Sequence, residues 1–332
     1  MAEIKKLAVL TSGGDSPAMN AAVYGFASAA ADKGIEVYGV IDGYKGLIHG
    51  NYRKIDLREF KKTIFSAGTD IGSSRCLEFK EAKVRQEAVD LFKKNNFDGL
   101  FVIGGDGSYM GASLISEIGC PVVVAPGTID NDVASSKYTI GYFSALEEIF
   151  QAVKKIKATS ESHSQVTFVE VMGRHCHDLS VAAAVAGAVD YVVTNASIKT
   201  EQELATIIKD MIVAGKKGIV ILVTEKVYGV EHGFELPSLR DLCVFLERAV
   251  GRQVRYSVLG YTQRGATPTS WDLYAAQRFG LTAFQLAYEG KWGNAVCFDG
   301  HDFGVVPLKE AVAMPKHVSN KLIDFVNAAY KI

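Results

Sequence analysis

Two aspartates that follow strand-like segments have the surroundings that phosphoryl transfer requires. Asp106 stands between glycines in the string IGGDGS (103–108), and Asp130 lies in PGTIDND (126–132). A carboxylate between glycines can hold Mg²⁺ while neighbouring N–H groups bind phosphate oxygens. A second carboxylate can orient and deprotonate an attacking hydroxyl. The two strings therefore predict transfer of a phosphoryl group from ATP to a hydroxyl of a small substrate.

These strings also have structural interpretations. TSGGDSP (11–17), after the first strand-like segment, is either a phosphate-binding turn or a tight strand-to-helix turn, with Pro17 in the first turn of the helix. Asp106 and Ser108 could cap a helix that begins at Tyr109, and DND (130–132) could be a solvated turn. We favour the chemical interpretation because GGDGS and PGTIDND follow consecutive strands, whose carboxyl ends meet at one sheet edge.

Several arginines and one glutamate also lie at or near the ends of strand-like segments. They are Arg75, Arg174, Arg255, Arg264 and Glu225. A single arginine of this kind usually belongs to a surface ion pair, but several at the ends of parallel strands predict a site for a phosphorylated substrate.

The composition is that of a globular protein of two domains. The 332 residues are 48% hydrophobic and 22% charged, and 36 basic residues nearly balance 37 acidic ones. This balance gives no broad basic surface, so neither nucleic acid nor a membrane is expected as a partner. Five scattered cysteines without a CxxC pair, and an N-terminus without a signal-peptide pattern, predict a cytoplasmic protein with reduced thiols and no zinc site.

Short apolar segments alternate with segments of helical periodicity, which is typical of an α/β protein with parallel sheets. The expected strands are 7–10, 36–41, 99–103, 121–125, 166–171, 191–193, 218–223 and 255–259. The expected helices are 17–33, 82–95, 109–118, 142–157, 179–186, 201–214 and 239–250. Residues 227–237 are expected to form a loop.

The chain resembles the bacterial ATP-dependent 6-phosphofructokinases along almost its whole length, through the strings TSGGD, DGYKGL, GTDIGSSR, VIGGDGSYMGA, PGTIDND, YTIGYFSAL, VEVMGR and VLGYTQRG. The resemblance implies an α/β fold of two Rossmann-like three-layer α/β/α domains with mainly parallel sheets. It places an ATP/Mg-binding domain in residues 1–140 plus about 262–311, and a sugar-phosphate-binding domain in 141–261 plus about 312–332. It also implies a homotetramer whose sugar site straddles a subunit interface.

The resemblance assigns roles to the matching positions. Catalysis is assigned to Asp130, as the base on the sugar C1 hydroxyl, with Thr128, Arg75 and Arg174. ATP is assigned to Gly14, Tyr44, Arg75, Cys76, Gly105, Asp106, Gly107 and Ser108, with Asp106 also holding Mg²⁺. The sugar is assigned to Thr128, Ile129, Asp130, Gln165, Met172, Gly173, Arg174, Glu225, Arg255, Tyr261, Gln263 and Arg264. Pyrophosphate-using relatives carry Asp and Lys where this chain has Gly107 and Gly127, so ATP is expected as the phosphoryl donor.

Two positions depart from the family pattern at the sugar's 6-phosphate. Gln165 replaces the usual arginine, and Tyr261 replaces the usual histidine. A charge-assisted hydrogen bond contributes about 1.5–3 kcal/mol, so two losses could weaken binding of a dianion about 100-fold or more. The substrate is either fructose 6-phosphate, with compensation from neighbours such as His163, His175 and His177, or a ketose with another anion at C6, such as 6-deoxy-6-sulfofructose.

A further departure concerns regulation. The arginine-rich effector site of the family corresponds here to Tyr24, Ser28, Leu57 and Lys157, while Lys216 and Lys217 are retained. We expect weak or absent control by nucleoside diphosphate or phosphoenolpyruvate, and a strong, saturable activation by ADP would contradict this. Asp70 is also unusual in a loop expected to approach ATP, and the sequence offers no physical reason for it.

Three other classes of protein fit the chain less well. A non-catalytic regulatory subunit has no need of intact Asp106, Thr128, Asp130 and Arg75. A lipid or NAD kinase shares the GGDG string but not PGTIDND or MGR. A dinucleotide-dependent oxidoreductase would carry GxGxxG after its first strand.

Overall fold

The computed structural model describes residues 4–229, 236–316, 318 and 320–329, and it divides into two units. Unit 1 comprises Met1–Ala145 and Arg264–Lys316, and unit 2 comprises Leu146–Gln263 and His317–Ile332. The domain boundaries expected from the resemblance lie within a few residues of these divisions. Each unit is described by itself below.

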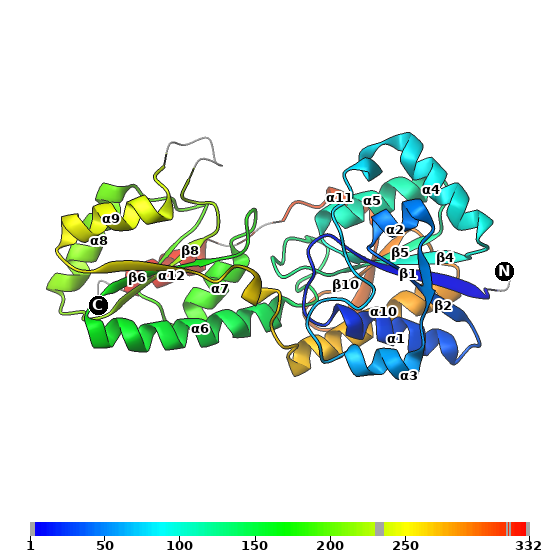
Figure 1. The fold of residues 1–332 in the computed structure, drawn as a ribbon, viewed down its shortest axis with the longest axis horizontal. Coiled ribbons are helices and arrows are strands. Elements are labelled where there is room, and N and C mark those ends of the chain that lie inside the picture. Colours follow the sequence, from blue (N-terminus) through cyan, green and yellow to red (C-terminus); the bar gives the residue numbers. More distant parts are fainter. Residues whose placement is uncertain (1–3, 230–235, 317, 319, 330–332) are drawn as a thin grey trace. The chain divides into compact units, whose positions relative to one another are not determined.

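Unit 1 is built on a seven-stranded, mainly parallel sheet in the order β11-β10-β5-β4-β1-β2-β3 (Figure 1). Its strands are β1 (Lys6–Ser12), β2 (Glu36–Val40), β3 (Tyr52–Lys54), β4 (Gly99–Gly104), β5 (Val122–Pro126), β10 (Asn294–Phe298) and β11 (Phe303–Pro307). Only the edge strands β3 and β11 run antiparallel to their neighbours. The central strands β4 and β5 are buried along their whole length, which is why their sequences are continuously apolar.

Helices cover both faces of this sheet. One face carries α1 (Met19–Ala31), α3 (Leu57–Phe60) and α10 (Ser270–Tyr288). The other face carries α2 (Tyr44–His49), α4 (Ala82–Lys94), α5 (Asp106–Glu117) and α11 (Leu308–Ala313). In β1, Leu7 and Val9 belong to the first core, whereas Ala8 and Leu10 belong to the second. This alternation follows from the pleat of a strand, and it produces three layers.

Unit 2 is built on a four-stranded parallel sheet in the order β7-β8-β6-β9 (Figure 1). Its strands are β6 (Val166–Val171), β7 (Tyr191–Val193), β8 (Ile219–Thr224) and β9 (Val254–Val258). One core joins the sheet to α8 (Glu201–Val213) and α9 (Leu239–Val250). On the other face, α7 (Asp178–Ala186) and α12 (Lys321–Ala328) pack against β7. The long helix α6 (Tyr142–His163) begins in unit 1 and continues in unit 2.

The predicted α/β fold is confirmed, but the prediction for Pro17 and the alternative structural interpretation of Asp106 and Ser108 are wrong. Pro17 does not lie in the first turn of a helix, because Ala18 adopts a left-handed backbone (φ 67°) and α1 begins only at Met19. Asp106 and Ser108 do not cap a helix that begins at Tyr109, because α5 begins at Asp106 with Gly105 as its N-cap. Asp106 therefore lies in the first turn of α5.

The loop expected at 227–237 lies only partly within the described residues. Within 227–237, residues 230–235 lie outside the described residues, and the others form neither helix nor strand. Among the described helices, none combines the length and the apolar character needed to cross a membrane.

Candidate active site

The glycine-rich turns after β1 and β4 lie against each other at the carboxyl edge of the first sheet. Ser12 is the β-sheet partner of Gly104, and a Cβ on Gly13 would lie 3.5 Å from Ser108 Oγ. A Cβ on Gly104 would lie only 2.4 Å from that same oxygen, so this approach requires glycine. The structure therefore brings the strings TSGGD and GGDGS together.

The helix α5 begins directly after the second of these turns. Its N-cap residue, Gly105, has no side chain to cap the first turn, where Asp106 and Gly107 are exposed. Free N–H groups and the positive end of the helix dipole favour an anion at this place. The arrangement can bind phosphate oxygens beside the Asp106 carboxylate.

Asp106 also suits a metal ion that is shared with a nucleotide. Mg²⁺ is usually held by one or two carboxylates together with substrate phosphates and water. Within the described residues, no group of three or more His, Cys, Asp or Glu could form a metal site of its own. A single exposed carboxylate beside a phosphate-binding turn fits the shared kind of site.

Tyr44 and Cys76, which the resemblance assigns to ATP, are at least partly buried. Tyr44 is 4% exposed, its Oη donates to the carbonyl of Ser108 at 2.7 Å, and its ring stacks on Phe79 with centroids 4.2 Å apart. Burial raises the pKa of Tyr44 well above its usual value. Partial burial likewise raises the pKa of the Cys76 thiol, which stays protonated near neutral pH. Tyr44 therefore holds the first turn of α5 in place.

The loop that carries Asp130 lies beside the same turn. Gly127 N–H donates to the carbonyl of Gly104 at 3.0 Å, and a Cβ on Gly105 would lie 3.5 Å from Thr128 Cβ. Within the loop, Asp130 N–H donates to Thr128 Oγ1 at 3.2 Å, and Asp130 Oδ1 is shielded from solvent. The N-terminus of α5 and the Asp130 loop thus form one constellation.

Two arginines border the first glycine-rich turn. The guanidinium of Arg264 packs on Gly14, where a Cβ would lie 2.9 Å from Arg264 Cζ, and its Nη1 lies 3.9 Å from Asp15 Oδ1. Arg75 is exposed and follows a segment whose Ser73 Oγ donates to the carbonyl of Gly13 at 2.8 Å. Arg264, which was assigned to the sugar, therefore lies next to a residue assigned to ATP.

The two glycines used to predict ATP rather than pyrophosphate differ in their surroundings. A Cβ on Gly107 would meet nothing within 4 Å, so this residue borders open space. A Cβ on Gly127 would lie 2.7 Å from Ile103 Cγ2 and 3.1 Å from Met19 Cε. Core packing alone explains the glycine at 127. At Gly107, in contrast, the open space leaves room for a nucleotide phosphate.

Unit 2 contains eight of the predicted sugar residues, and six of them lie after the carboxyl ends of its strands. We call Met172, Gly173, Arg174, Glu225, Tyr261 and Gln263 the carboxyl-edge group. Gln263 is fully buried, its Oε1 accepts from Met172 N–H at 3.0 Å, and its Nε2 donates to the carbonyl of Gly260 at 3.0 Å. Tyr261, in contrast, is 79% exposed. Gln263 therefore joins the loops after β6 and β9, and the last member of the group, Glu225, directly follows β8.

Gln165 and Arg255 lie at the opposite edge of that sheet, and we call them the amino-edge group. Gln165 directly precedes β6, and Arg255 is the partner of Thr167 in the β6–β9 pairing. Gln165 Nε2 donates to Thr167 Oγ1 at 3.4 Å, and Arg255 Nη1 donates to Glu247 Oε2 at 2.8 Å. At about 3.3 Å per residue, β6 separates this group from Met172 by roughly 16–23 Å. Unit 2 of a single chain therefore does not bring the carboxyl-edge group and the amino-edge group to the same ligand.

The neighbouring histidines differ in their surroundings. His163 Nδ1 lies 3.0 Å from the carbonyl of Thr159 in its own helix, and His175 is exposed. His177 is 9% exposed, and its Nδ1 lies 2.9 Å from Asn195 Oδ1. Its Nε2 is buried without a hydrogen-bond partner among the described residues. The His177–Asn195 pair links the loops after β6 and β7. The sequence did not predict this pairing.

Two of the three lysines at positions that correspond to the family's effector site have partners inside unit 2. Lys157 Nζ donates to the carbonyls of Gly187 at 3.1 Å and Ala188 at 2.5 Å. Lys216 Nζ forms an ion pair with Asp190 Oδ1 at 2.6 Å. Their charges are thus partly balanced within the chain.

The fold and the site together define a class, an α/β phosphotransferase of two units. Residues 6–287 match the family model described as phosphofructokinase, and the chain belongs to that family. It is a phosphofructokinase-type kinase, a phosphotransferase that acts on an alcohol group.

Known proteins agree with this assignment. The chain is 44% identical over 293 residues to the ATP-dependent 6-phosphofructokinases of Vibrio campbellii and Edwardsiella ictaluri, covering 88% of this chain and 89% of each relative. It is similar to Pichia pastoris phosphofructokinase in the T-state, with TM-score 0.85 and 30% identity over 94% of this chain, although it spans only 36% of that longer chain. A pyrophosphate-dependent phosphofructokinase from Marinobacter aquaeolei shares the fold at TM-score 0.85 and 18% identity, over 98% of this chain and 91% of that chain.

Proposed function

We propose that this protein transfers the γ-phosphoryl group of Mg·ATP to the C1 hydroxyl of fructose 6-phosphate in the cytoplasm. The supporting observation is the contact between the Asp130 loop and the N-terminus of α5, where Gly127 N–H lies 3.0 Å from the carbonyl of Gly104. This contact puts a carboxylate for the acceptor hydroxyl beside a turn suited to phosphate. Relatives 44% identical are named ATP-dependent 6-phosphofructokinase, which supports ATP as the donor.

The proposed roles follow from the chemistry of each group. Asp130 orients the C1 hydroxyl and takes its proton, and the N–H groups at the start of α5 bind phosphate oxygens. Asp106 holds Mg²⁺, which when bound neutralises charge on the β- and γ-phosphates. Arg75 balances charge on the phosphoryl group in transfer, and Arg174 binds the sugar.

We infer that the working protein contains at least two copies of the chain. The carboxyl-edge and amino-edge groups lie at opposite ends of β6, so a ligand that needs both must be bound by two copies. Closed homo-oligomers supply such shared sites by symmetry. The homotetramer implied by the resemblance fits this requirement.

The experiment that tests the substrate is a comparison of kcat/KM for fructose 6-phosphate, tagatose 6-phosphate, 6-deoxy-6-sulfofructose and unphosphorylated fructose. We expect fructose 6-phosphate to exceed fructose by at least about 100-fold, because a C6 dianion forms several charge-assisted hydrogen bonds. Equal rates with fructose would contradict a C6 anion site. A clear preference for the sulfonate would select the second candidate substrate, which the neutral side chains of Gln165 and Tyr261 favour.

A double variant distinguishes the two candidate substrates, fructose 6-phosphate and 6-deoxy-6-sulfofructose. Gln165→Arg combined with Tyr261→His restores two chargeable donors, and it should raise kcat/KM for fructose 6-phosphate by about 10- to 100-fold. The gain for the monoanionic sulfonate should be smaller. An unchanged kcat/KM for fructose 6-phosphate would show that neither position faces the C6 group.

The choice of ATP can be tested at Gly107. Gly107→Asp should raise the KM for ATP at least about 10-fold, because a new carboxylate would repel the polyphosphate. Since a Cβ there meets nothing within 4 Å, the melting temperature should not change. Gly107→Ala is the control and should leave the KM for ATP nearly unchanged. An unaltered KM in the Asp variant would remove Gly107 from the nucleotide site.

We also propose that effector control is weak. Tyr24, Ser28 and Leu57 carry no charge, and the ion pair of Lys216 with Asp190 balances one of the three lysine charges, which leaves few cationic groups for an effector phosphate. Kinetics without and with ADP test this, and a strong, saturable activation would contradict it.

A further inference from the structure

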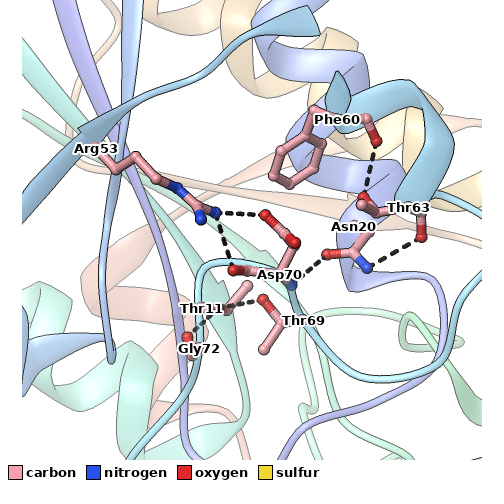
Figure 2. Close-up of polar contacts among 8 residues, drawn as sticks. All are labelled: Thr11, Asn20, Arg53, Phe60, Thr63, Thr69, Asp70 and Gly72. Carbon is pink, nitrogen blue, oxygen red and sulfur yellow. Dashed lines mark hydrogen bonds and ion pairs between the residues drawn. The ribbon is translucent and has the colours of Figure 1, made fainter. Parts of the chain in front are cut away.

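The segment 68–75 ends at Arg75 and is held near its middle by Asp70 (Figure 2). Asp70 N–H donates to Asn20 Oδ1 at 2.8 Å, which joins the segment to α1. Arg53 Nη2 donates to the carbonyl of Asp70 at 2.9 Å and also to its carboxylate, which joins the segment to β3. Asp70 is therefore held by its N–H, its carbonyl and its side chain at once.

The residues around Asp70 connect the segment to the first glycine-rich turn. Thr11 Oγ1 donates to the carbonyl of Gly72 at 2.8 Å and lies 2.8 Å from Thr69 Oγ1 (Figure 2). Because the single hydroxyl hydrogen of Thr11 goes to Gly72, Thr69 is the donor in the second bond. Ser73 Oγ then donates to the carbonyl of Gly13 at 2.8 Å. A displacement of the segment would therefore also move the turn at 11–14.

The inner and outer attachments of the segment differ in burial. Asn20 is 2% exposed, its Nδ2 donates to the carbonyl of Thr63 at 3.1 Å, and Ile71 is fully buried. The Arg53 and Asp70 side chains are 51% and 37% exposed. The buried contacts stabilise the fold, whereas the Arg53–Asp70 pair lies at the surface and can change without opening the core.

The charge of this pair matters because the segment borders a place suited to anions. An unpaired carboxylate at Asp70 would add negative charge near a bound polyphosphate and oppose its binding. Arg53 balances that charge and holds the carboxylate toward β3. The loss of Arg53 should therefore be worse than the loss of the Asp70 charge.

We propose that Arg53 and Asp70 form a positioning pair that holds segment 68–75 against the glycine-rich turn, and so sets the affinity for the nucleotide polyphosphate. This inference rests on the proposed binding of ATP in unit 1. Neither residue touches the reacting atoms, and both act through Arg75 and the turn at 11–14.

The experiment compares Arg53→Met, Asp70→Asn and the double variant with the wild-type chain in its natural oligomeric state. Arg53→Met should raise the KM for ATP about two- to fivefold with kcat and the KM for the ketose nearly unchanged, a range typical of one partly exposed ion pair. Asp70→Asn should have a smaller effect, because it keeps both backbone bonds and leaves no free carboxylate. The double variant should fall between the two single variants, because no unpaired charge remains but the bond from Arg53 to the Asp70 carbonyl is lost.

Lys54→Met is the matched control. Lys54 is adjacent to Arg53 on β3, and it forms its ion pair with Glu36 of β2 rather than with a residue of the segment. Its loss removes the same charge and should leave the KM for ATP unchanged. An equal rise in Lys54→Met would show that bulk charge is responsible, and an Arg53→Met variant with a lower melting temperature but an unchanged KM for ATP would show a merely structural role. Either result overturns the proposal.

Direct binding of ATP, measured by calorimetry, keeps this inference separate from the proposed function. A wild-type protein that binds ATP but phosphorylates no ketose would refute the function, and the pair would then be judged by the dissociation constants of the same variants. A wild-type protein that binds no ATP would overturn both.

Discussion

Asp130→Ser is expected to lower kcat by about 10²–10⁴-fold, the range in which a general base contributes to catalysis. The serine hydroxyl can still form a hydrogen bond, but it cannot accept the proton of the attacking C1 hydroxyl. The KM for ATP should change little, because the groups that we propose to bind phosphate lie on the turn at 11–14 and on α5. Steady-state kinetics with saturating ATP and ketose measure the effect.

The neighbouring carboxylate provides the control for Asp130. Asp132 is two residues further along the same loop, and Asp132→Asn should reduce kcat less than Asp130→Ser. Circular dichroism and melting temperatures should show both variants folded. A kcat for Asp130→Ser within a few-fold of the wild-type value would remove Asp130 from the role of base.

Activity should be recovered when two inactive variants are mixed, if two copies of the chain share each sugar site. Arg174→Ala disables the carboxyl-edge group, and Arg255→Ala disables the amino-edge group. Each variant should lose about 10- to 100-fold in kcat/KM for the ketose, as for the loss of a charge-assisted hydrogen bond. In co-assembled mixtures about a quarter of the sites should be intact, since each contribution is undamaged in half of the copies.

The control mixture combines two variants of one edge. Arg174→Ala and Glu225→Gln both affect the carboxyl-edge group, so no pairing of these copies produces an intact site and no activity should return. Copies that carry two different affinity tags should be recovered together on either tag, which confirms that they exchange. Co-assembled Arg174→Ala and Arg255→Ala copies without recovered activity would refute a site shared in this way.

The amino-acid pattern was sufficient to predict the fold class and the ends of many elements. Continuous apolar runs such as those of β4 and β5 predict buried parallel strands, and parallel strands place their carboxyl ends at one edge. From the sequence alone, that geometric rule assigns Asp106 and Asp130 to one constellation of functional groups. Local signals failed where backbone conformation depends on the surroundings, as at Ala18, whose left-handed conformation delays the start of α1.

By itself, the sequence determined which chemical groups follow which strands, because hydrophobic periodicity and glycine-rich turns are local properties of the chain. Only the tertiary structure decided which of these groups meet. It placed Gln165 and Arg255 at the opposite sheet edge from Arg174, because residues at the two ends of a strand cannot converge. It also explained Asp70, whose partners Arg53 and Asn20 are distant in sequence and are brought to it only by the packing of β3 and α1.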